Sequence, residues 1–212
     1  MIRVVVGPPV SRNKTPLSDI AANTLVQHYN SGPSPKVHHP LNPAVRHSKP
    51  LNKKAQFFEY AILDGRRIVP TSRTKRKNAG SSIVKVVWND ETYTGVITHI
   101  FRHDQLSVMD EILWAEILWM AKLDMCAVNG NPWSDFPELE VEFWRHDYYH
   151  QPGTLGVPPS VIPFKVIWCP AACGELKLYR PPMWVTTTLP RVRSQHMSLM
   201  SVANMIYSIL LF

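Results

Sequence analysis

Residues 83–101 read IVKVVWNDETYTGVITHIF, and this stretch decides the fold class. Its two halves, 83–88 and 92–101, are rich in the β-branched and aromatic residues that favour strands. Between them, Asn89 and Asp90 form the kind of polar pair that takes the backbone angles of a tight turn. The stretch therefore predicts two antiparallel strands joined by a short turn.

Further strand-like segments lie on both sides of this hairpin. Residues 57–63 and 66–70 flank Asp64-Gly65, a pair typical of hairpin turns. Residues 113–120 are apolar at nearly every position, which favours a central strand buried on both faces, with a turn or two of helix as the alternative. Additional strands are expected in the later part of the chain, at 139–144, 161–168, 176–179 and 184–189.

Many short strands separated by turn signals predict a mainly β fold. We expect a small barrel-like twisted sheet with short helical or loop insertions. The 19 prolines against 9 glycines agree, because proline interrupts long helices. The carboxylates of Glu138, Glu140 and Glu142 recur two apart, as expected for a solvated acidic strand face.

The 212 residues suffice for one full-sized domain and additional segments. Residues 1–54 alternate Pro, Ser, Asn, His and Lys, which predicts a disordered basic arm with a short helix near Leu25. Residues 55–191 would form the β-rich domain. Residues 192–212 form an apolar C-terminal tail that can be helical, and its uncharged part is shorter than the ~20 residues of a membrane span. A membrane is therefore not an expected partner.

Charge is unevenly distributed along the chain. Residues 1–80 hold 14 Lys and Arg against 3 Asp and Glu, whereas residues 81–212 hold 9 against 13. A cationic segment on a mildly acidic body is common in proteins that bind nucleic acid or an acidic partner. A solvated segment that only maintains solubility is the alternative.

The strongest local basic signal is a cluster of cations in and before the loop at 71–80. Such a cluster can contact phosphate or serve as a nuclear import signal, and a plain solvated loop is the alternative. The candidate binding residues are Arg66, Arg67, Arg73, Lys75, Arg76 and Lys77.

The three cysteines, Cys126, Cys169 and Cys173, are odd in number and favour a reducing compartment. His146 and His150 are four apart, as are Cys169 and Cys173, so two nitrogens and two sulfurs form an alternative zinc-binding set. The order of the pairs and the stiff Pro170 between the cysteines argue against it. We therefore predict no metal, with buried thiols as the expectation.

No motif for catalysis stands out in the sequence. There is no Gly-x-Ser-x-Gly turn, and Gly80-Ser81-Ser82 has neither the second glycine nor the lysine of a phosphate-binding loop. We therefore expect a protein that is not an enzyme and that takes no cofactor or small-molecule substrate.

Aromatic side chains are the remaining signal. Some of them can line a cage for a methylated ammonium group through cation–π attraction, although most large rings in a small domain belong to the core. The aromatic residues selected as contact candidates are Tyr93, Trp119 and Tyr148.

The order of three segments resembles that of bromo-adjacent homology domains. The segments are 93–101, with its Tyr-x-Gly-x-Ile strand, 113–120 with its tryptophans, and 161–169, which ends in a cysteine after a hydrophobic-Pro start. The resemblance covers about half of the chain. It implies a β-rich, non-catalytic interaction module of chromatin proteins, located in the nucleus, with a protein or nucleosome as partner and nucleic acid as a further contact through the basic arm.

A second resemblance concerns residues 64–86. These look like segments of uncharacterised proteins of mushroom-type fungi that lie near transposon remnants. The alternative hypothesis is therefore a non-catalytic remnant of a mobile-element protein, and this similarity implies no activity of its own.

Overall fold

A computed structural model describes residues 4–31, 37–41, 48–74, 81–105, 112–123, 133, 135–177 and 182–189. Several predictions fall on residues outside these ranges. They concern Lys75, Arg76 and Lys77 of the basic loop, Cys126, and the apolar tail at 192–212.

The described chain is mainly β, as predicted, with one α-helix and short 3-10 turns among its described residues. The helical elements are α1 (Asp19–Tyr29), η1 (Thr71–Arg73), η3 (Pro137–Leu139) and η4 (Phe164–Val166). The strands are β1 (Val4–Val6), β2 (Thr15–Pro16), β3 (Val37–His38), β4 (Lys49–Pro50), β5 (Lys54–Phe57), β6 (Ala61–Leu63), β7 (Arg66–Ile68), β8 (Ile83–Trp88), β9 (Glu91–His103), β10 (Leu113–Lys122), β11 (Glu142–Tyr149), β12 (Val161–Pro163), β13 (Ile167–Leu176) and β14 (Met183–Thr188).

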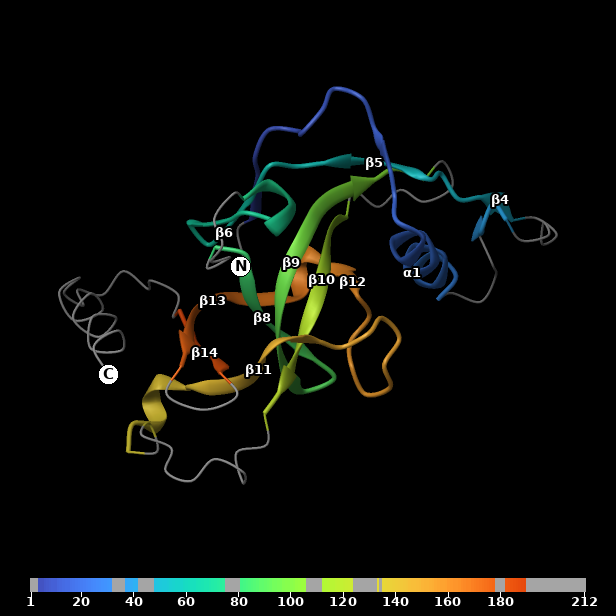
Figure 1. The fold of residues 1–212 in the computed structure, drawn as a ribbon. Coiled ribbons are helices and arrows are strands. Elements are labelled where there is room, and N and C mark those ends of the chain that lie inside the picture. The colour runs from blue at the N-terminus through green and yellow to red at the C-terminus, as the bar shows by residue number, and fades with distance from the viewer. Residues whose placement is uncertain are drawn as a thin grey trace.

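The largest sheet is partly closed into a ring. Its strand order is β12-β10-β11-β14-β13-β8-β9-β5-β2, and β9 pairs with β10 as well. The pairings therefore run from β8 through β9, β10, β11, β14 and β13 back to β8 (Figure 1). The junction of β10 with β11 is irregular, since the register shifts between Met120 and Lys122. A smaller sheet, β1-β6-β7, lies beside this ring.

The hairpin expected at 83–101 is present. Trp88 pairs with Glu91, and both turn residues have positive φ, 49° at Asn89 and 64° at Asp90. Two positive φ angles in a two-residue loop match the right-handed twist of the flanking strands. The long strand β9 then pairs with β5, β8 and β10 and is therefore a central strand of the largest sheet.

Among the later predictions, one is confirmed and two need adjustment. Residues 113–120 are a strand, which excludes the helical alternative. Residues 161–168 are interrupted by η4, because Pro163 precedes a tight turn that redirects the chain from β12 into β13. The strand expected at 176–179 does not start there, since β13 already runs through Cys173 to Leu176.

At Gly95, side chains of β10 lie close against the backbone of β9. A Cβ atom at this position would lie 2.4 Å from Cγ2 of Ile117 and 2.9 Å from Cε3 of Trp119. Both neighbours are buried, with 1% and 2% of their surface exposed. The glycine therefore allows these two strands to pack at this point.

The core consists of three apolar clusters among the described residues. The sheet core contains Val84, Ile97, Ile117 and Phe164 and lies under the small sheet. The ring core has one buried residue on each of five ring strands, and Trp184 of β14 packs against it, so it fills the inside of the ring. Its buried members are Ile83, Val96, Met120, Trp144 and Ala171. The helix core joins α1 to the ends of β9, β10 and β12 and contains Leu25, Tyr29, Phe101, Trp114 and Val161.

The prediction of a disordered arm at residues 1–54 does not hold for its described part. Strand β1 pairs with β6, β2 pairs with β5, and α1 packs on the sheet. The short helix expected near Leu25 is α1, capped by Ser18, whose Oγ accepts from the Ala21 amide at 3.1 Å. Buried Ala21, Ala22, Leu25 and Tyr29 give the helix one apolar face, which the polar residues around it obscure in the sequence.

In the part of the chain that the structure describes, we find no helix with the length and apolar character needed to cross a membrane.

Candidate binding surface

The basic hairpin β6–β7 lies at one end of the molecule. Its turn consists of Asp64 and Gly65, with φ angles of 48° and 83°. Arg66 and Arg67 follow directly on β7, and the guanidinium carbon of Arg67 lies 3.8 Å from the centroid of the Tyr60 ring. This distance is within the range of cation–π attraction, so the ring supports an exposed arginine at the surface.

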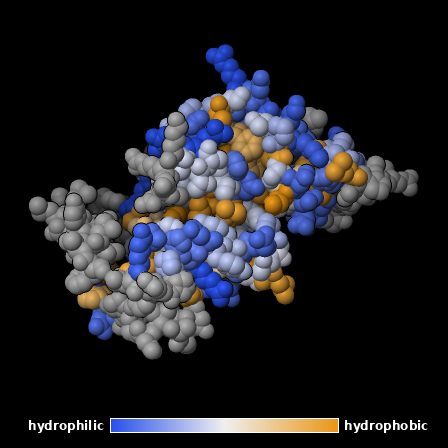
Figure 2. All heavy atoms as spheres, in the orientation of Figure 1, coloured by the Kyte–Doolittle hydropathy of each residue, from blue (hydrophilic) through white to orange (hydrophobic). Residues whose placement is uncertain are grey.

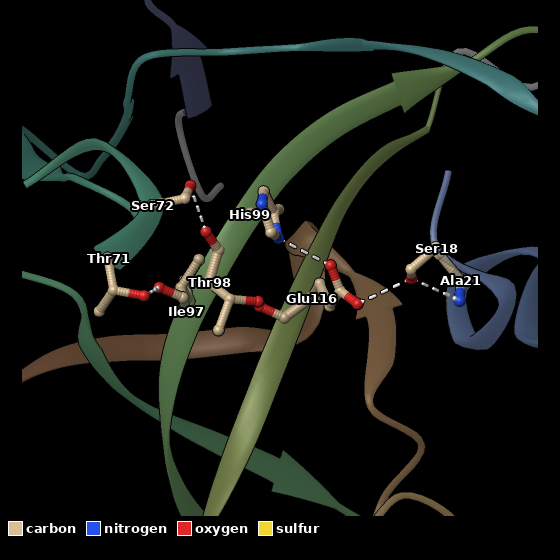
Figure 3. Close-up of polar contacts among 8 residues, drawn as sticks. All are labelled: Ser18, Ala21, Thr71, Ser72, Ile97, Thr98, His99 and Glu116. Carbon is tan, nitrogen blue, oxygen red and sulfur yellow. Dashed lines mark hydrogen bonds and ion pairs between the residues drawn. The ribbon is translucent and has the colours of Figure 1, made fainter. Parts of the chain in front are cut away.

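Arg73 ends the 3-10 turn η1, which is anchored on β9. The Thr71 hydroxyl donates to the carbonyl oxygen of Ile97 at 3.4 Å, and the Ser72 hydroxyl donates to that of Thr98 at 2.6 Å (Figure 3). Arg73 is exposed and is therefore displayed from a fixed turn. The predicted contacts Lys75, Arg76 and Lys77 follow it in the sequence and lie outside the described residues.

Exposed cations are in excess near one end of the described molecule, and exposed anions are in excess near the other. The elements β5 and β6 lie at the top of Figure 1, and β11 lies at the bottom. Figure 2 shows that hydrophilic residues cover much of the upper part of the same view. The exposed cations on or near α1, β2, β4, β5, β7 and η1 are Arg12, Lys14, Lys49, Lys54, Arg67 and Arg73, and the exposed anions there are Asp19 and Asp104. On or near η3, β10, β11 and β13 the exposed anions are Asp135, Glu138, Glu140, Asp147 and Glu175, and the exposed cations are Lys122, Arg145 and Lys177.

The three aromatic contact candidates are not gathered into one cage. The rings of Tyr93 and Trp119 meet edge to face at 6.0 Å, but Trp119 is buried and its Nε1 donates to the Pro159 carbonyl at 3.1 Å. Trp119 therefore belongs to the core, which corrects its selection as a contact residue. Tyr148 is 53% exposed on β11, where the Arg145 guanidinium lies 5.5 Å from its ring centroid.

Tyr93 is also committed to internal contacts. Its hydroxyl can donate to the Glu91 carboxylate at 2.6 Å or to the Gly156 carbonyl at 2.9 Å. The hydrogen bond to Glu91, with burial, raises the pKa of the Tyr93 hydroxyl, because the carboxylate favours the protonated phenol. The residue thereby fixes the loop that contains Gly156 over the sheet.

His146, a member of the alternative zinc set, has other partners. Its ring stacks on the Trp184 ring with centroids 4.6 Å apart. Its Nδ1 lies 3.1 Å from an Asp147 oxygen, and its Nε2 lies 3.2 Å from Glu175 Oε1. Both ring nitrogens are thus directed to carboxylates, which leaves neither free to bind a metal.

The two late thiols lie on β13, where Cys169 is buried and Cys173 is half-buried. Burial raises the pKa of the Cys173 thiol to about 12, and Cys169 is 2% exposed. Among the described residues, no group of three or more His, Cys, Asp or Glu side chains could hold a metal ion. The alternative zinc site of His146, His150, Cys169 and Cys173 is therefore not formed.

A row of polar contacts links α1, β10 and β9. The Ser18 hydroxyl donates to Glu116 Oε1 at 2.9 Å, and Glu116 Oε2 lies 2.8 Å from Nδ1 of His99 (Figure 3). Burial alone would raise the pKa of the Glu116 carboxyl, but the hydrogen bonds from His99 and Ser18 outweigh it, so the net pKa is lowered.

Serine, histidine and a carboxylate within bonding distance raise the question of a catalytic triad. In such a triad the imidazole lies between the hydroxyl and the carboxylate, so that it can take the hydroxyl proton. Here the Glu116 carboxylate lies between Ser18 and His99 instead. The Ser18 oxygen also accepts from the Ala21 amide as the helix cap. The row is therefore suited to holding α1 on the sheet and not to activating the serine.

A buried ion pair inside the ring was missed by the sequence analysis. Lys85 Nζ lies 2.9 Å from Glu142 Oε2, and the two side chains are 3% and 18% exposed. Lys122 Nζ is 4.0 Å from the other oxygen of Glu142, and Thr94 lies 3.5 Å from Oε2. Glu142 had been assigned to a solvated acidic face, whereas it points to the lysine of β8. The available signal was a single lysine within the apolar run at 83–88.

One small pocket lies among the described residues. It encloses about 10 Å³, roughly the space of one water molecule, which is too little for a substrate. It lies where the β6–β7 turn meets the start of β13 and is lined by Leu63, Asp64, Arg66, Trp168, Cys169, Pro170 and Leu189.

Comparison of the chain with models of protein families, with curated proteins and with solved structures found no match. Its function is therefore argued from the surface itself.

Proposed function

We propose that this protein is a non-catalytic interaction module that docks on the nucleic acid of chromatin, such as a nucleosome, through its basic end. The observation that carries the proposal is the uneven distribution of exposed charge. Arg67 and Arg73 are exposed at the end that holds β5–β7, where exposed cations outnumber exposed anions, while an excess of exposed acidic residues lies near η3 and β11. The resemblance to bromo-adjacent homology domains adds the expectation of a chromatin partner and a nuclear location.

The physical basis is attraction to a phosphate backbone. Each Lys or Arg that neutralises a phosphate releases condensed counterions, which favours binding at low salt. Arg67 is already laid on the Tyr60 ring, so less conformational freedom is lost when it binds. The sequence between Arg73 and Ser81 also contains Lys75, Arg76 and Lys77. The acidic end would face away from the polyanion and orient the module.

The test compares two double variants with the same change of charge. Arg67→Glu/Arg73→Glu alters the basic end, and Arg145→Glu/Lys177→Glu alters the opposite end. Binding to a DNA duplex and to nucleosome core particles is measured by fluorescence anisotropy over a series of salt concentrations. We expect the first variant to weaken binding strongly and to lower the slope of log K against log salt by about 0.9 for each lost phosphate contact.

The control variant, Arg145→Glu/Lys177→Glu, should keep nearly the full slope of log K against log salt. Equal losses in the two variants would show that only net charge acts, and unchanged binding of Arg67→Glu/Arg73→Glu would refute the basic end as the contact surface. Failure of the unaltered protein to bind either DNA or nucleosomes at low salt would refute the proposed function as a whole.

A further inference from the structure

Both ends of α1 are attached to the same strand, β9, through histidines. At the last turn, the Tyr29 hydroxyl lies 2.8 Å from Nδ1 of His103, and the two rings stack at 5.7 Å. At the first turn, the cap residue Ser18 reaches His99 through the Glu116 carboxylate (Figure 3). The two histidines are four residues apart on β9 and lie under opposite ends of the helix.

The bonding of His103 fixes which nitrogen carries its proton. Its Nε2 lies 2.6 Å from the carbonyl oxygen of Asn52, which can only accept, so Nε2 carries hydrogen. In the neutral ring Nδ1 then accepts the hydrogen bond that the Tyr29 hydroxyl donates. His103 is 1% exposed. A second proton would place hydrogen on both nitrogens, remove this acceptor and put a charge in a buried site.

The first turn is held by a carboxylate instead. Glu116 Oε2 lies 2.8 Å from Nδ1 of His99, and the hydrogen bonds from His99 and Ser18 outweigh burial and lower the pKa of the Glu116 carboxyl, so it stays charged. The carboxylate also accepts from Ser18 and so stays bonded to the helix cap. Mild acid therefore leaves the attachment at Ser18 in place while it weakens the attachment at Tyr29.

The apolar packing of α1 is separate from the rest of the core. Its buried residues belong to the helix core and are absent from the sheet core and the ring core. Release of the helix would uncover Phe101, Trp114 and Val161 while the closed part of the sheet stays packed. Local opening of such a unit does not require global unfolding.

We infer that α1 is a pH-sensitive clasp: acid frees its last turn from His103 while Glu116 and His99 keep its first turn in place, which uncovers the apolar surface beneath the helix.

The direction follows from the chemistry of His103. Burial lowers the pKa of its imidazole, and this outweighs the opposing effects of the Asn52 carbonyl and Asp104. The closed state therefore resists a proton that the open state accepts near the ordinary histidine pKa of about 6.5. The stabilisation is complete above about pH 6.5 and is lost as the pH falls below it. In that window the opening equilibrium should rise by up to about tenfold per pH unit.

Other titratable groups face the same region. Asp104 and Lys14 form an ion pair next to His103, and Lys14 contributes to lowering its pKa. His28 lies on the last turn of α1, edge-on to the Trp114 ring. A proton on His28 would favour the carbonyl end of the helix, which is the opposite sense to His103. The variants below separate these contributions.

The test is amide hydrogen exchange of the full chain between pH 7.5 and 5.5, corrected for intrinsic rates. Opening of the last turn of α1 is compared with opening of β8 in the same sample. We expect the last turn to open up to about tenfold more per pH unit below 6.5, while β8 and the first turn change little. His103→Gln should abolish this pH response, and His28→Gln, the matched control, should keep it.

The inference would be overturned if the ratio between the opening equilibria of the last turn of α1 and of β8 stayed constant over this pH range. It would also be overturned if the pH response survived in His103→Gln. Parallel opening of β8 would show global unfolding and would overturn it too. If circular dichroism shows that His103→Gln does not fold, Tyr29→Phe serves instead. This variant should open the last turn about fivefold more at pH 7.5, the effect of one lost hydrogen bond, and an unchanged value would contradict the clasp.

Discussion

The ion pair inside the ring allows a sharp test of how the sheet is held together. Replacing Glu142 with leucine leaves the Lys85 ammonium, 3% exposed, without its counter-charge. Replacing Lys85 with methionine leaves a carboxylate that is 18% exposed and still has Lys122 at 4.0 Å. The two single substitutions should therefore have unequal effects on the free energy of unfolding.

The expected sizes follow from these surroundings. An uncompensated buried charge costs about 3–5 kcal/mol, so we expect this loss for Glu142→Leu. Lys85→Met should cost only about 1–2 kcal/mol, because water and Lys122 still reach the carboxylate. The double variant removes both charges and should lie within about 1 kcal/mol of the unaltered protein, since apolar pairs often replace buried ion pairs without loss.

Urea unfolding followed by tryptophan fluorescence measures all four proteins, with the free energy extrapolated to water. The double variant is its own control, because it shows whether the two side chains interact. The reasoning would be refuted if Lys85→Met were as harmful as Glu142→Leu, or if the double variant lost the sum of the two single losses.

Three further predictions concern packing, capping and reactivity. Gly95→Ala should cost about 1–3 kcal/mol, because its Cβ would lie 2.4 Å from Cγ2 of Ile117, and an unchanged urea midpoint would contradict this close approach. Ser18→Ala should cost about 1 kcal/mol in thermal unfolding through loss of the helix cap and of the bond to Glu116, with Ser18→Thr as the control that restores most of it. Cys173, whose pKa burial raises to about 12, should be alkylated at pH 8 far more slowly in the folded protein than in urea, and fast labelling of the folded protein, seen by mass spectrometry, would disprove its burial.

The strands were predictable where one local signal dominates. Asn89-Asp90 and Asp64-Gly65 are turn pairs, and both take the positive φ angles that such pairs favour. The apolar run at 113–120 forms a strand within the sheet, where it pairs with β9, β11 and β12. In each case the local sequence and the final packing favour the same structure.

The order of the N-terminal region was not predictable in the same way. Val4, Val5 and Val6 form too short a run to identify a strand by itself, and β1 exists because β6 offers it a partner. The helix α1 depends on Phe101 and Trp114, which come much later in the sequence. Composition describes an isolated segment, whereas these elements are stabilised by distant ones.

The exposure of the candidate cations was predictable in part. Arg67 and Arg73 are exposed on a hairpin and a fixed turn, Arg66 is half-buried, and their role in binding stays a prediction. Trp119 was misassigned because a tryptophan on a central strand can face either the core or solvent, and the sequence does not say which. The Lys85–Glu142 pair could not be anticipated, since its two residues meet only when β8 and β11 face each other across the ring.

The closure of the ring has a consequence during synthesis of the chain. Strand β8 is made early, but its partner β13 and the joining strand β14 follow only near the end of the described chain. Until then, nascent molecules on neighbouring ribosomes carry an open edge at β8, to which another chain can add. Chains that end before Met183 lack β14 and would keep unpaired strand edges on β11 and β13. Such chains are expected to aggregate.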